Sequence, residues 1–256
     1  MKIAIYGDSW ASEFLNEPHN YLGWPEIIAK QSGYEVTNFA VPGSSLYFSY
    51  REFLKNHKNY DVNIFLITNY GRLYVKSIPE YGRNNTSKHV PNLLNVINRK
   101  KQLPDDPLDP VIKNKVTKIY DTLEKYFAYI QDNEYDELVD RALVHHARSM
   151  STNTIFIPCF RGYDDFSLIN VYKMENDSLG ANEKYFSKGI HLNTEIDGKI
   201  LVDVRVCHMT KRNNERFAEK LIKSIKENNI AVKFSLDDFV APTENIDEVF
   251  VWRNIG

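Results

Sequence analysis

Lys2-Ile3-Ala4-Ile5-Tyr6-Gly7-Asp8-Ser9 stands at the start of the chain and decides the fold class. Residues 2–6 alternate as a strand does and are rich in β-branched and aromatic side chains, which predicts a strand in a sheet core. Gly7 ends that strand and allows a tight turn without a Cβ clash. Ser9 then lies at the carboxyl end of the first strand, where open α/β sheets usually bind their ligands. A serine there can act as a nucleophile if the rest of the chain supplies a base.

Apolar strands alternate with helical patterns along most of the chain, which is typical of a parallel sheet wrapped by helices. Strands are predicted at residues 2–6, 34–40, 62–68 and 153–158. Helices are predicted at residues 24–30, 44–56, 111–130, 134–149 and 213–228. A half-exposed strand is also expected over residues 200–207, because valines alternate there with charged residues. The predicted fold class is therefore α/β.

The chain of 256 residues is long enough for one large domain or two small ones. We expect a single α/β domain over residues 1–229. Residues 70–110 are rich in Asn, Lys, Arg and Pro and carry only a weak helical pattern at 93–97, so they are predicted to be an insertion that shapes a pocket or moves. Residues 163–189 are irregular and could cover a pocket. Residues 230–256 form a C-terminal extension that the pattern does not place.

The composition excludes several classes of function. The formal net charge is −2 and no long Lys/Arg block occurs, so nucleic acid is not expected as a partner. The longest apolar runs are shorter than the ~20 residues that a membrane span needs. Asp8 and Glu13 interrupt any apolar core of a signal peptide, and Cys159 and Cys207 form no CxxC motif, so a reducing cytoplasm is the default location. The abundance of Lys, Asn, Ile and Tyr indicates an AT-rich genome, such as a viral one.

Two further segments could complete a serine site, which needs donors aimed at a developing oxyanion. Gly43 ends the second strand and opens a helix, so its backbone N–H would point into the same crevice as Ser9. Asn69 ends the third strand, and its side chain offers an N–H donor at the same edge. Each position also has a structural interpretation. Asp8, Ser9 or Ser44 could cap a helix, and Asn is common in turns.

His208 is the first candidate for the base, because it precedes the last long helix and a loop could return it to the carboxyl edge of the sheet. His191 is a second choice. His145 and His146 lie within a predicted helix without acidic partners at ligand spacing, so no metal site is expected. The sequence contains no GxGxxG or GxxxxGK[ST] loop, which argues against a dinucleotide or P-loop enzyme.

Ser9, Gly43, Asn69 and His208 occur in the order of the four blocks of the SGNH hydrolase (GDSL-type esterase/lipase) family, and the chain resembles that family. The resemblance covers most of the chain and leaves out the insertion and the tail. It implies a flavodoxin-like three-layer α/β/α sandwich with a central parallel sheet. It also implies a serine that attacks an acyl ester, an oxyanion held by the N–H groups of Ser9 and Gly43 and by Asn69, and no metal or organic cofactor. Small acyl esters, including O-acetyl groups on a carbohydrate, are the implied substrates.

The chain departs from the family pattern at two places. The third block is Ile67-Thr68-Asn69-Tyr70, which lacks the usual glycine and aspartate. The acid expected three residues before the histidine is replaced by Arg205, which cannot orient an imidazole as a carboxylate does. Asp203 is the nearest substitute, but a regular strand would put Asp203 and His208 on opposite faces, so a bend would be needed. Asp203 could instead pair with Arg205, which would leave a Ser9–His208 dyad.

We therefore expect a serine esterase in which Ser9 is the nucleophile, His208 is the base and Asp203 is the candidate acid of a triad. The alternative is a catalytically weak or inactive SGNH-like domain that binds a carbohydrate or a protein. Arg205 and the incomplete third block favour that alternative. Hydrolysis of a simple ester separates the two.

Overall fold

The computed structural model describes residues 1–11, 22–68, 71–78, 88–90, 92–103, 108–159, 194–196, 199–201, 211–229, 232 and 238. The helices are α1 (Trp24–Ser32), α2 (Leu46–Asn56), α3 (Leu93–Gln102), α4 (Pro110–Tyr129), α5 (Asn133–Met150) and α6 (Lys211–Lys226), with a 3₁₀ turn at His57–Asn59. The strands are β1 (Lys2–Tyr6), β2 (Glu35–Asn38), β3 (Val62–Ile67), β4 (Leu73–Tyr74), β5 (His89–Val90), β6 (Thr154–Pro158), β7 (Thr194–Ile196) and β8 (Lys199–Leu201). Within these residues, none of the helices combines the length and the apolar character that crossing a membrane requires.

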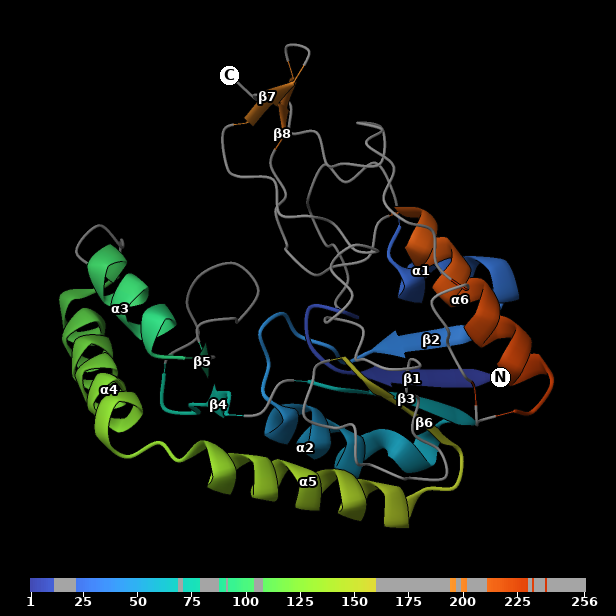
Figure 1. The fold of residues 1–256 in the computed structure, drawn as a ribbon, viewed down its shortest axis with the longest axis horizontal. Helices are drawn as coiled ribbons and strands as arrows, with labels where there is room; N and C mark the ends of the chain where they lie inside the picture. The colour runs from blue at the N-terminus through green and yellow to red at the C-terminus, as the bar shows by residue number, and fades with distance from the viewer. Residues whose placement is uncertain are drawn as a thin grey trace.

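A parallel sheet with the strand order β2-β1-β3-β6 forms the centre of the fold (Figure 1). β1 pairs with β2 on one side and with β3 on the other, so its carboxyl end is flanked by two parallel neighbours. Helices α1 and α6 cover one face of the sheet, and α2 and α5 cover the other. This three-layer arrangement confirms the predicted α/β/α fold class with a central parallel sheet.

Alternate residues of β1 face the two helical layers, as the period of a strand requires. Ile3 and Ile5 pack into the core that contains α1 and α6. Ala4 and Tyr6 pack into the core that contains α2 and α5. All four side chains are fully buried. Residues 3–6 carry no charged side chain because a strand covered on both faces has no position that favours one, whereas Lys2 at its start is exposed.

The ends of α1 and α2 follow from local side chains. α1 has Pro25 in its first turn and ends before Gly33, whose φ of +71° is a left-handed conformation that glycine adopts without strain. α2 begins after Ser45, whose hydroxyl accepts a hydrogen bond from the N–H of Phe48. Ser44, which could also have capped this helix, donates from its hydroxyl to the carbonyl of Gly7 instead.

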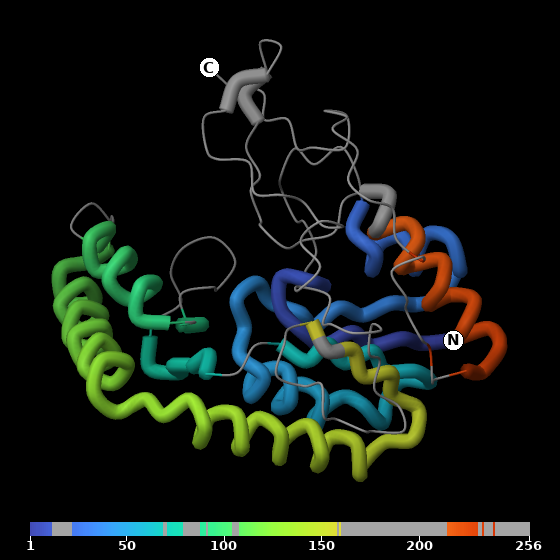
Figure 2. The backbone as a smooth tube through the Cα atoms, viewed as in Figure 1, coloured from blue at the N-terminus to red at the C-terminus, as the bar shows by residue number. Residues whose placement is uncertain are grey.

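The elements β4, β5, α3 and α4 enclose a core of their own, and we call them the helical unit (Figure 2). Its buried apolar residues are Ile78, Val90, Val96, Leu103, Val116, Tyr120 and Leu123. Lys100 of α3 forms ion pairs with Asp121 and Glu124 of α4. The predicted insertion at 70–110 therefore contains a helix of 10 residues, α3, and shares its core with α4.

Two residues of the predicted C-terminal extension are described, and both contact the main domain. Val232 is buried in the core with α1 and α6. Asp238 pairs with Lys220 of α6. β7 and β8 pair with each other in antiparallel fashion. Of the strand predicted at 200–207, the first two residues belong to β8 and the remainder lies outside the described residues.

Candidate functional site

Ser9 lies on the turn that follows β1, at the carboxyl edge of the central sheet, and it is half-buried. We call residues 7–11 the nucleophile turn. Asp8 in this turn is fully buried. Its Oδ1 accepts a hydrogen bond from the N–H of Trp10 (3.1 Å), and its carbonyl accepts one from the N–H of Ala11 (3.1 Å). The Asp8 side chain thus shapes the turn that carries Ser9, as Asx turns commonly do.

Gly7 is needed because β3 passes close to the nucleophile turn. A Cβ atom at this position would lie 2.8 Å from the Cβ of Leu66. Such a distance forces one strand to shift, because both atoms are fixed to the backbone of a buried sheet. The close approach of a neighbouring strand is therefore the reason for the glycine that ends β1.

The carbonyl of Gly7 joins the nucleophile turn to the loop at Val41–Ser44, which we call the glycine loop. It accepts hydrogen bonds from the N–H of Val41 (3.1 Å) and from Oγ of Ser44 (2.8 Å). Gly43 was expected directly at the end of the second strand. β2 ends at Asn38, however, so Gly43 stands within the glycine loop. Two of the segments that the sequence singled out are thus bonded to each other at one edge of the sheet.

Gly43 occupies the third position of a tight turn. The N–H of Ser44 donates to the carbonyl of Val41 (3.0 Å) and closes the turn. Pro42 stands at the second position and the φ of Gly43 is +71°, a combination that suits a type II turn. Among the described residues, the N–H of Gly43 has no acceptor. This N–H is the donor that the sequence predicts for an oxyanion, and that role stays a prediction.

The end of β3 bonds to the same nucleophile turn. Thr68 follows β3, is fully buried, and donates from Oγ1 to Oδ2 of Asp8 (2.7 Å). Asn69, the expected side-chain donor of the site, comes next in the chain and lies outside the described residues. Its role stays a prediction.

Arg72 belongs to this site and was not predicted from the sequence. Its Nη1 donates to Oδ2 of Asp8 (2.6 Å) and to Oγ1 of Thr68 (2.9 Å), with a longer contact to the carbonyl of Ser44 (3.4 Å). One signal could have pointed to such a residue. A carboxylate placed directly after a buried strand is itself buried, and a buried carboxylate needs a charged partner.

The start of α6 also contacts the nucleophile turn, through Trp24. The indole Nε1 of Trp24 donates to the carbonyl of Trp10 (2.7 Å). The backbone N–H of Trp24 donates to Oδ1 of Asn214 in the first turns of α6 (3.0 Å). α6 is the helix that follows His208 in the chain. His208, His191, Asp203 and Arg205 lie outside the described residues, so their roles stay predictions.

Three of the described histidines have contacts of their own. Nδ1 of His57 bonds to the carbonyl of Phe53 (2.9 Å), and Nδ1 of His146 bonds to the hydroxyl of Tyr50 (2.6 Å). His89 is buried in the helical unit. Burial lowers its pKa to about 4, and nearby cationic side chains act in the same direction, so its imidazole is neutral at pH 7. These three histidines are therefore not assigned as the base of a serine site.

Cys159, at the end of β6, does not offer a second nucleophile. Its side chain is fully buried. Burial raises the pKa of the thiol well above its ordinary value, and the negative charge of Asp8 acts in the same direction, so the thiolate does not form at pH 7. Across the part of the chain that the structure describes, no group of three or more His, Cys, Asp or Glu side chains could hold a metal ion.

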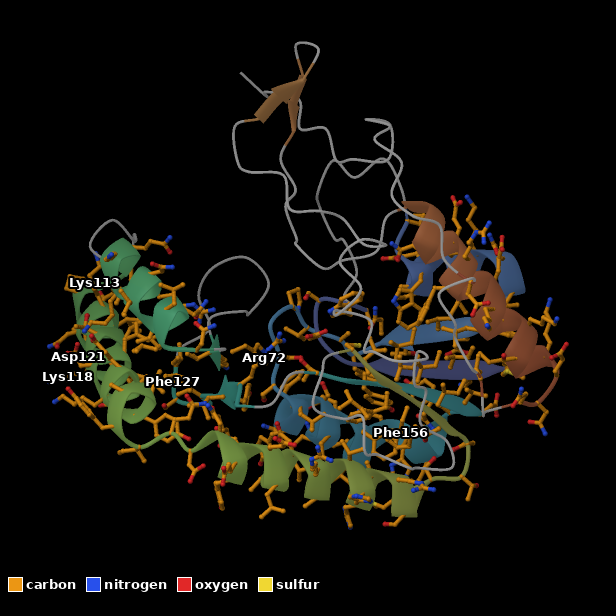
Figure 3. The ribbon with its side chains drawn as sticks, in the orientation of Figure 1. Arg72, Lys113, Lys118, Asp121, Phe127 and Phe156 are labelled. Atoms are coloured by element: carbon orange, nitrogen blue, oxygen red, sulfur yellow. The ribbon has the colours of Figure 1, made fainter. Side chains whose placement is uncertain are left out.

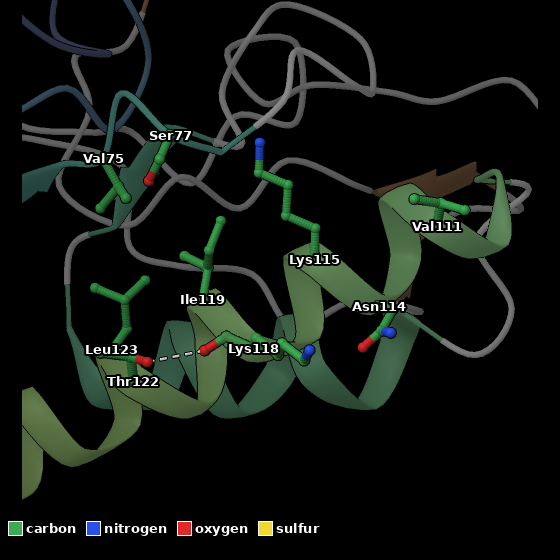
Figure 4. A pocket seen from close by; sticks show the side chains of 9 residues that line it. All are labelled: Val75, Ser77, Val111, Asn114, Lys115, Lys118, Ile119, Thr122 and Leu123. Carbon is green, nitrogen blue, oxygen red and sulfur yellow. Dashed lines mark hydrogen bonds between the residues drawn. The ribbon is translucent and has the colours of Figure 1, made fainter.

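A groove of about 600 Å³ lies on the helical unit between α4 and residues 75–77 (Figure 4). Its lining residues are Val75, Ser77, Val111, Asn114, Lys115, Lys118, Ile119, Thr122 and Leu123. The side chain of Lys115 extends upward from α4 at the rim, on the same side as Ser77. Figure 3 places Lys118 near one end of the molecule, with Arg72 between Lys118 and Phe156. The groove is lined by the helical unit, and its lining residue Val75 stands three positions after Arg72 in the chain.

The turn before Arg72 docks on the start of α5. Nε2 of Gln131 donates to the carbonyl of Gly71 (3.4 Å) and to Oδ2 of Asp136 (3.0 Å). Asp140 accepts a hydrogen bond from the backbone of Gly71. The φ of Gly71 is +73°, and a Cβ there would lie 2.8 Å from Nε2 of Gln131. The backbone position of Arg72 is therefore set by α5.

Asp140 makes the stability of the fold depend on pH. Burial raises the pKa of its carboxyl from an ordinary value of 3.8 to about 7, the charge of Asp136 adds to this, and the hydrogen bond from Gly71 opposes it. The unfolded chain releases this proton near pH 4 and the folded protein near pH 7. The stability that the group contributes is thus complete below about pH 4 and is lost as the pH rises through about 7.

Asp140→Asn is therefore expected to stabilise the fold at about pH 8 and to change its stability little at about pH 4. The asparagine has nearly the same shape, keeps an oxygen for the N–H of Gly71 and carries no charge. Urea unfolding of both proteins at the two pH values measures the difference. The same difference between the proteins at both pH values would contradict this assignment.

No protein-family model matches the chain, and no curated protein matches it in sequence. Two solved structures are similar to it. One is a protein assigned to the lipolytic G-D-S-L family from Desulfitobacterium hafniense DCB-2, with 14% sequence identity, a TM-score of 0.28, and a match over 63% of this chain and 62% of that protein. The other is the acetyl xylan esterase AlAXEase, with 15% identity, a TM-score of 0.33, and a match over 88% of this chain and 100% of the esterase.

The chain spans less than two thirds of the length of the G-D-S-L protein that it matches. The α/β/α architecture follows from the sheet order and the two helical layers of the chain itself.

Proposed function

We propose that this chain is a serine hydrolase of the SGNH type that cleaves acyl esters. The observation that supports this most is the pair of hydrogen bonds to the carbonyl of Gly7, which ties the glycine loop to the nucleophile turn. Acyl transfer needs a nucleophile and a backbone donor at one place, each about 3 Å from the reacting group. The bonds to the Gly7 carbonyl hold the loops that carry Ser9 and Gly43 together at one edge of the sheet, which supports the proposal.

In the proposed mechanism His208 takes the proton of the Ser9 hydroxyl while Oγ attacks the ester carbonyl carbon. The resulting oxyanion accepts hydrogen bonds from the N–H groups of Ser9 and Gly43 and from the side chain of Asn69. When the intermediate collapses, the alcohol leaves with the proton that His208 holds. Water activated by His208 then attacks the acyl group, and the acid leaves as Ser9 recovers its proton.

The place of α6 supports His208 as the base. His208 stands three residues before Lys211, the first residue of α6, and three residues of extended chain span about 10 Å. The first turns of α6 are bonded through Trp24 to the carbonyl of Trp10, next to Ser9 in the chain. This link between α6 and the nucleophile turn supports His208 as the base in the proposed mechanism.

Two versions of the site differ in the group that orients His208. Asp203 completes a triad if the chain bends before the histidine, and a Ser9–His208 dyad works without it. We propose small acyl esters as substrates, among them O-acetyl groups on a carbohydrate, because the sequence blocks resemble those of GDSL-type esterases. Side chains and backbone N–H groups perform every step, without a metal or an organic cofactor.

Hydrolysis of p-nitrophenyl acetate by the wild type and by Ser9→Ala tests the function. We expect turnover by the wild type, a loss of at least about 10³-fold in Ser9→Ala, and labelling of Ser9 by a fluorophosphonate probe. Ser32→Ala is a matched control, because this hydroxyl bonds to the carbonyl of Ile28 within α1. The same assay on Asp203→Asn distinguishes the triad from the dyad. Equal inactivity of wild type and Ser9→Ala, with Ser9 unlabelled, would end the proposal.

The alternative is binding without efficient hydrolysis, with a carbohydrate or a protein as the partner. The groove on the helical unit favours it, because the groove combines apolar side chains with Lys115 and Lys118. A wild type that neither hydrolyses esters nor reacts with the probe, and that binds a carbohydrate in calorimetry, would favour this alternative.

A further inference from the structure

Arg72 joins three loops that carry the proposed site. Its Nη1 lies 2.6 Å from Oδ2 of Asp8, 2.9 Å from Oγ1 of Thr68 and 3.4 Å from the carbonyl oxygen of Ser44. These three partners are the sequence neighbours of Ser9, Asn69 and Gly43. One nitrogen atom therefore contacts the nucleophile turn, the end of β3 and the glycine loop.

We propose that Arg72 is a positioning residue for ester hydrolysis at Ser9, and that it holds these three loops in one arrangement. The inference rests on the proposed function of Ser9. Arg72 acts through Asp8, Thr68 and Ser44 and does not itself touch the substrate. Its effect on the reaction comes from the distance between the nucleophile and the oxyanion donors, to which acyl transfer is sensitive.

The charge of Arg72 is needed because Asp8 is fully buried. The side chain of Arg72 is 15% exposed and that of Asp8 is 0% exposed. A buried carboxylate that loses its partner either takes up a proton or moves toward water. Either response alters the hydrogen bonds that Asp8 accepts from Trp10 and Thr68. Ser9 lies between two of these residues in the chain and moves with them.

The backbone of Arg72 is fixed from the opposite side. Gly71 bonds to Gln131 and Asp140 at the start of α5. Figure 3 shows Arg72 between the helical unit and the sheet. Arg72 is thus held at its backbone by α5 and at its guanidinium by the three loops. It therefore fixes the position of these loops relative to α5. A lysine would keep the charge without the planar group that makes several directed bonds.

The experiment compares Arg72→Met and Arg72→Lys with the wild type, using the full chain. Arg141→Met is the matched control, because Arg141 makes an ion pair of the same length, 2.6 Å, with Glu137 inside α5. We measure kcat and KM for p-nitrophenyl acetate, and amide hydrogen exchange in peptides that cover residues 7–11 and 41–45. Peptides from β1 and β3 report whether the sheet stays folded.

Arg72→Met is expected to lower kcat about 100-fold while KM changes less than about threefold, because it misplaces the reacting groups without removing a substrate contact. Arg72→Lys is expected to lower kcat about tenfold, a partial rescue by the retained charge. In both variants the two loop peptides exchange faster and the strand peptides do not. If Arg72→Met fails to fold, the lysine variant decides by the same measurements.

If the folded Arg72 variants have the same kcat and the same loop exchange as the wild type, this role of Arg72 is overturned. The proposed function stays intact in that case, provided that turnover by the wild type depends on Ser9. If the wild type shows no Ser9-dependent turnover, the proposed function fails instead. The exchange measurement then decides alone: faster exchange in both loop peptides supports the holding role of Arg72, and unchanged exchange overturns it.

Discussion

Replacement of Gly7 by alanine is expected to lower the free energy of unfolding by about 3 kcal/mol. The new Cβ would lie 2.8 Å from the Cβ of Leu66, with further contacts at 3.1 and 3.2 Å to the same side chain. Leu66 belongs to β3, which pairs with β1 on one side and β6 on the other, so it cannot move away without breaking a strand pairing. The strain therefore spreads into the nucleophile turn, and ester hydrolysis should fall with stability.

Urea unfolding of Gly7→Ala measures this loss, and Gly33→Ala is the matched control. Gly33 has a φ of +71° and no atom within 4 Å of an added Cβ, so its replacement costs only the backbone strain of about 1 kcal/mol. If Gly7→Ala is as stable as Gly33→Ala or more stable, the prediction is contradicted, because β3 must then be able to move away from the added Cβ.

Replacement of Trp24 by alanine is expected to lower the free energy of unfolding by about 4 kcal/mol. The side chain is 1% exposed and packs edge-to-face on Phe217 of α6, with ring centroids 5.2 Å apart. Its indole N–H also donates to the carbonyl of Trp10, which would lose its described partner. The variant thus leaves a cavity between α1 and α6 and frees the end of the nucleophile turn.

Trp24→Phe distinguishes the two contributions in part, because the smaller phenyl ring keeps some of the packing while the indole N–H is lost. We expect a loss of about 1–3 kcal/mol for that variant in urea unfolding. Tyr129→Ala serves as the control for removal of an aromatic ring, since Tyr129 is 85% exposed and its loss should change stability by less than about 0.5 kcal/mol. Equal effects of Trp24→Ala and Tyr129→Ala would contradict the place of Trp24 in the core.

The helices of this fold were predictable where apolar spacing and caps agree. Helices were expected at 111–130 and 134–149, and α4 and α5 span Pro110–Tyr129 and Asn133–Met150. Asp109 and Asp132 cap them, each accepting hydrogen bonds from two backbone N–H groups. α3 was harder to predict because its length depends on packing against α4, which a local pattern does not contain.

The partners of Asp8 could not be predicted, because they are set by the fold and not by local spacing. Arg72 lies 64 positions from Asp8 along the chain, and the sequence offers 32 Lys and Arg residues as candidates. Ser44 could have capped the helix, as a serine before a helix commonly does, but its hydroxyl donates to the carbonyl of Gly7. Ser9 and Gly43 both lie in loops that follow parallel strands of the sheet, and their roles, like those of Asn69, Asp203 and His208, stay predictions.

The separate core of the helical unit has an evolutionary consequence. The buried residues of that unit are not shared with either core beside the sheet. Mutations that enlarge, shorten or recharge α3 and α4 can therefore accumulate without repacking the sheet and its covering helices. Such mutations can affect the proposed site through Arg72, because Arg72 binds the buried Asp8 directly. The surface of the helical unit can therefore change in evolution while the sheet and its edge loops keep their arrangement.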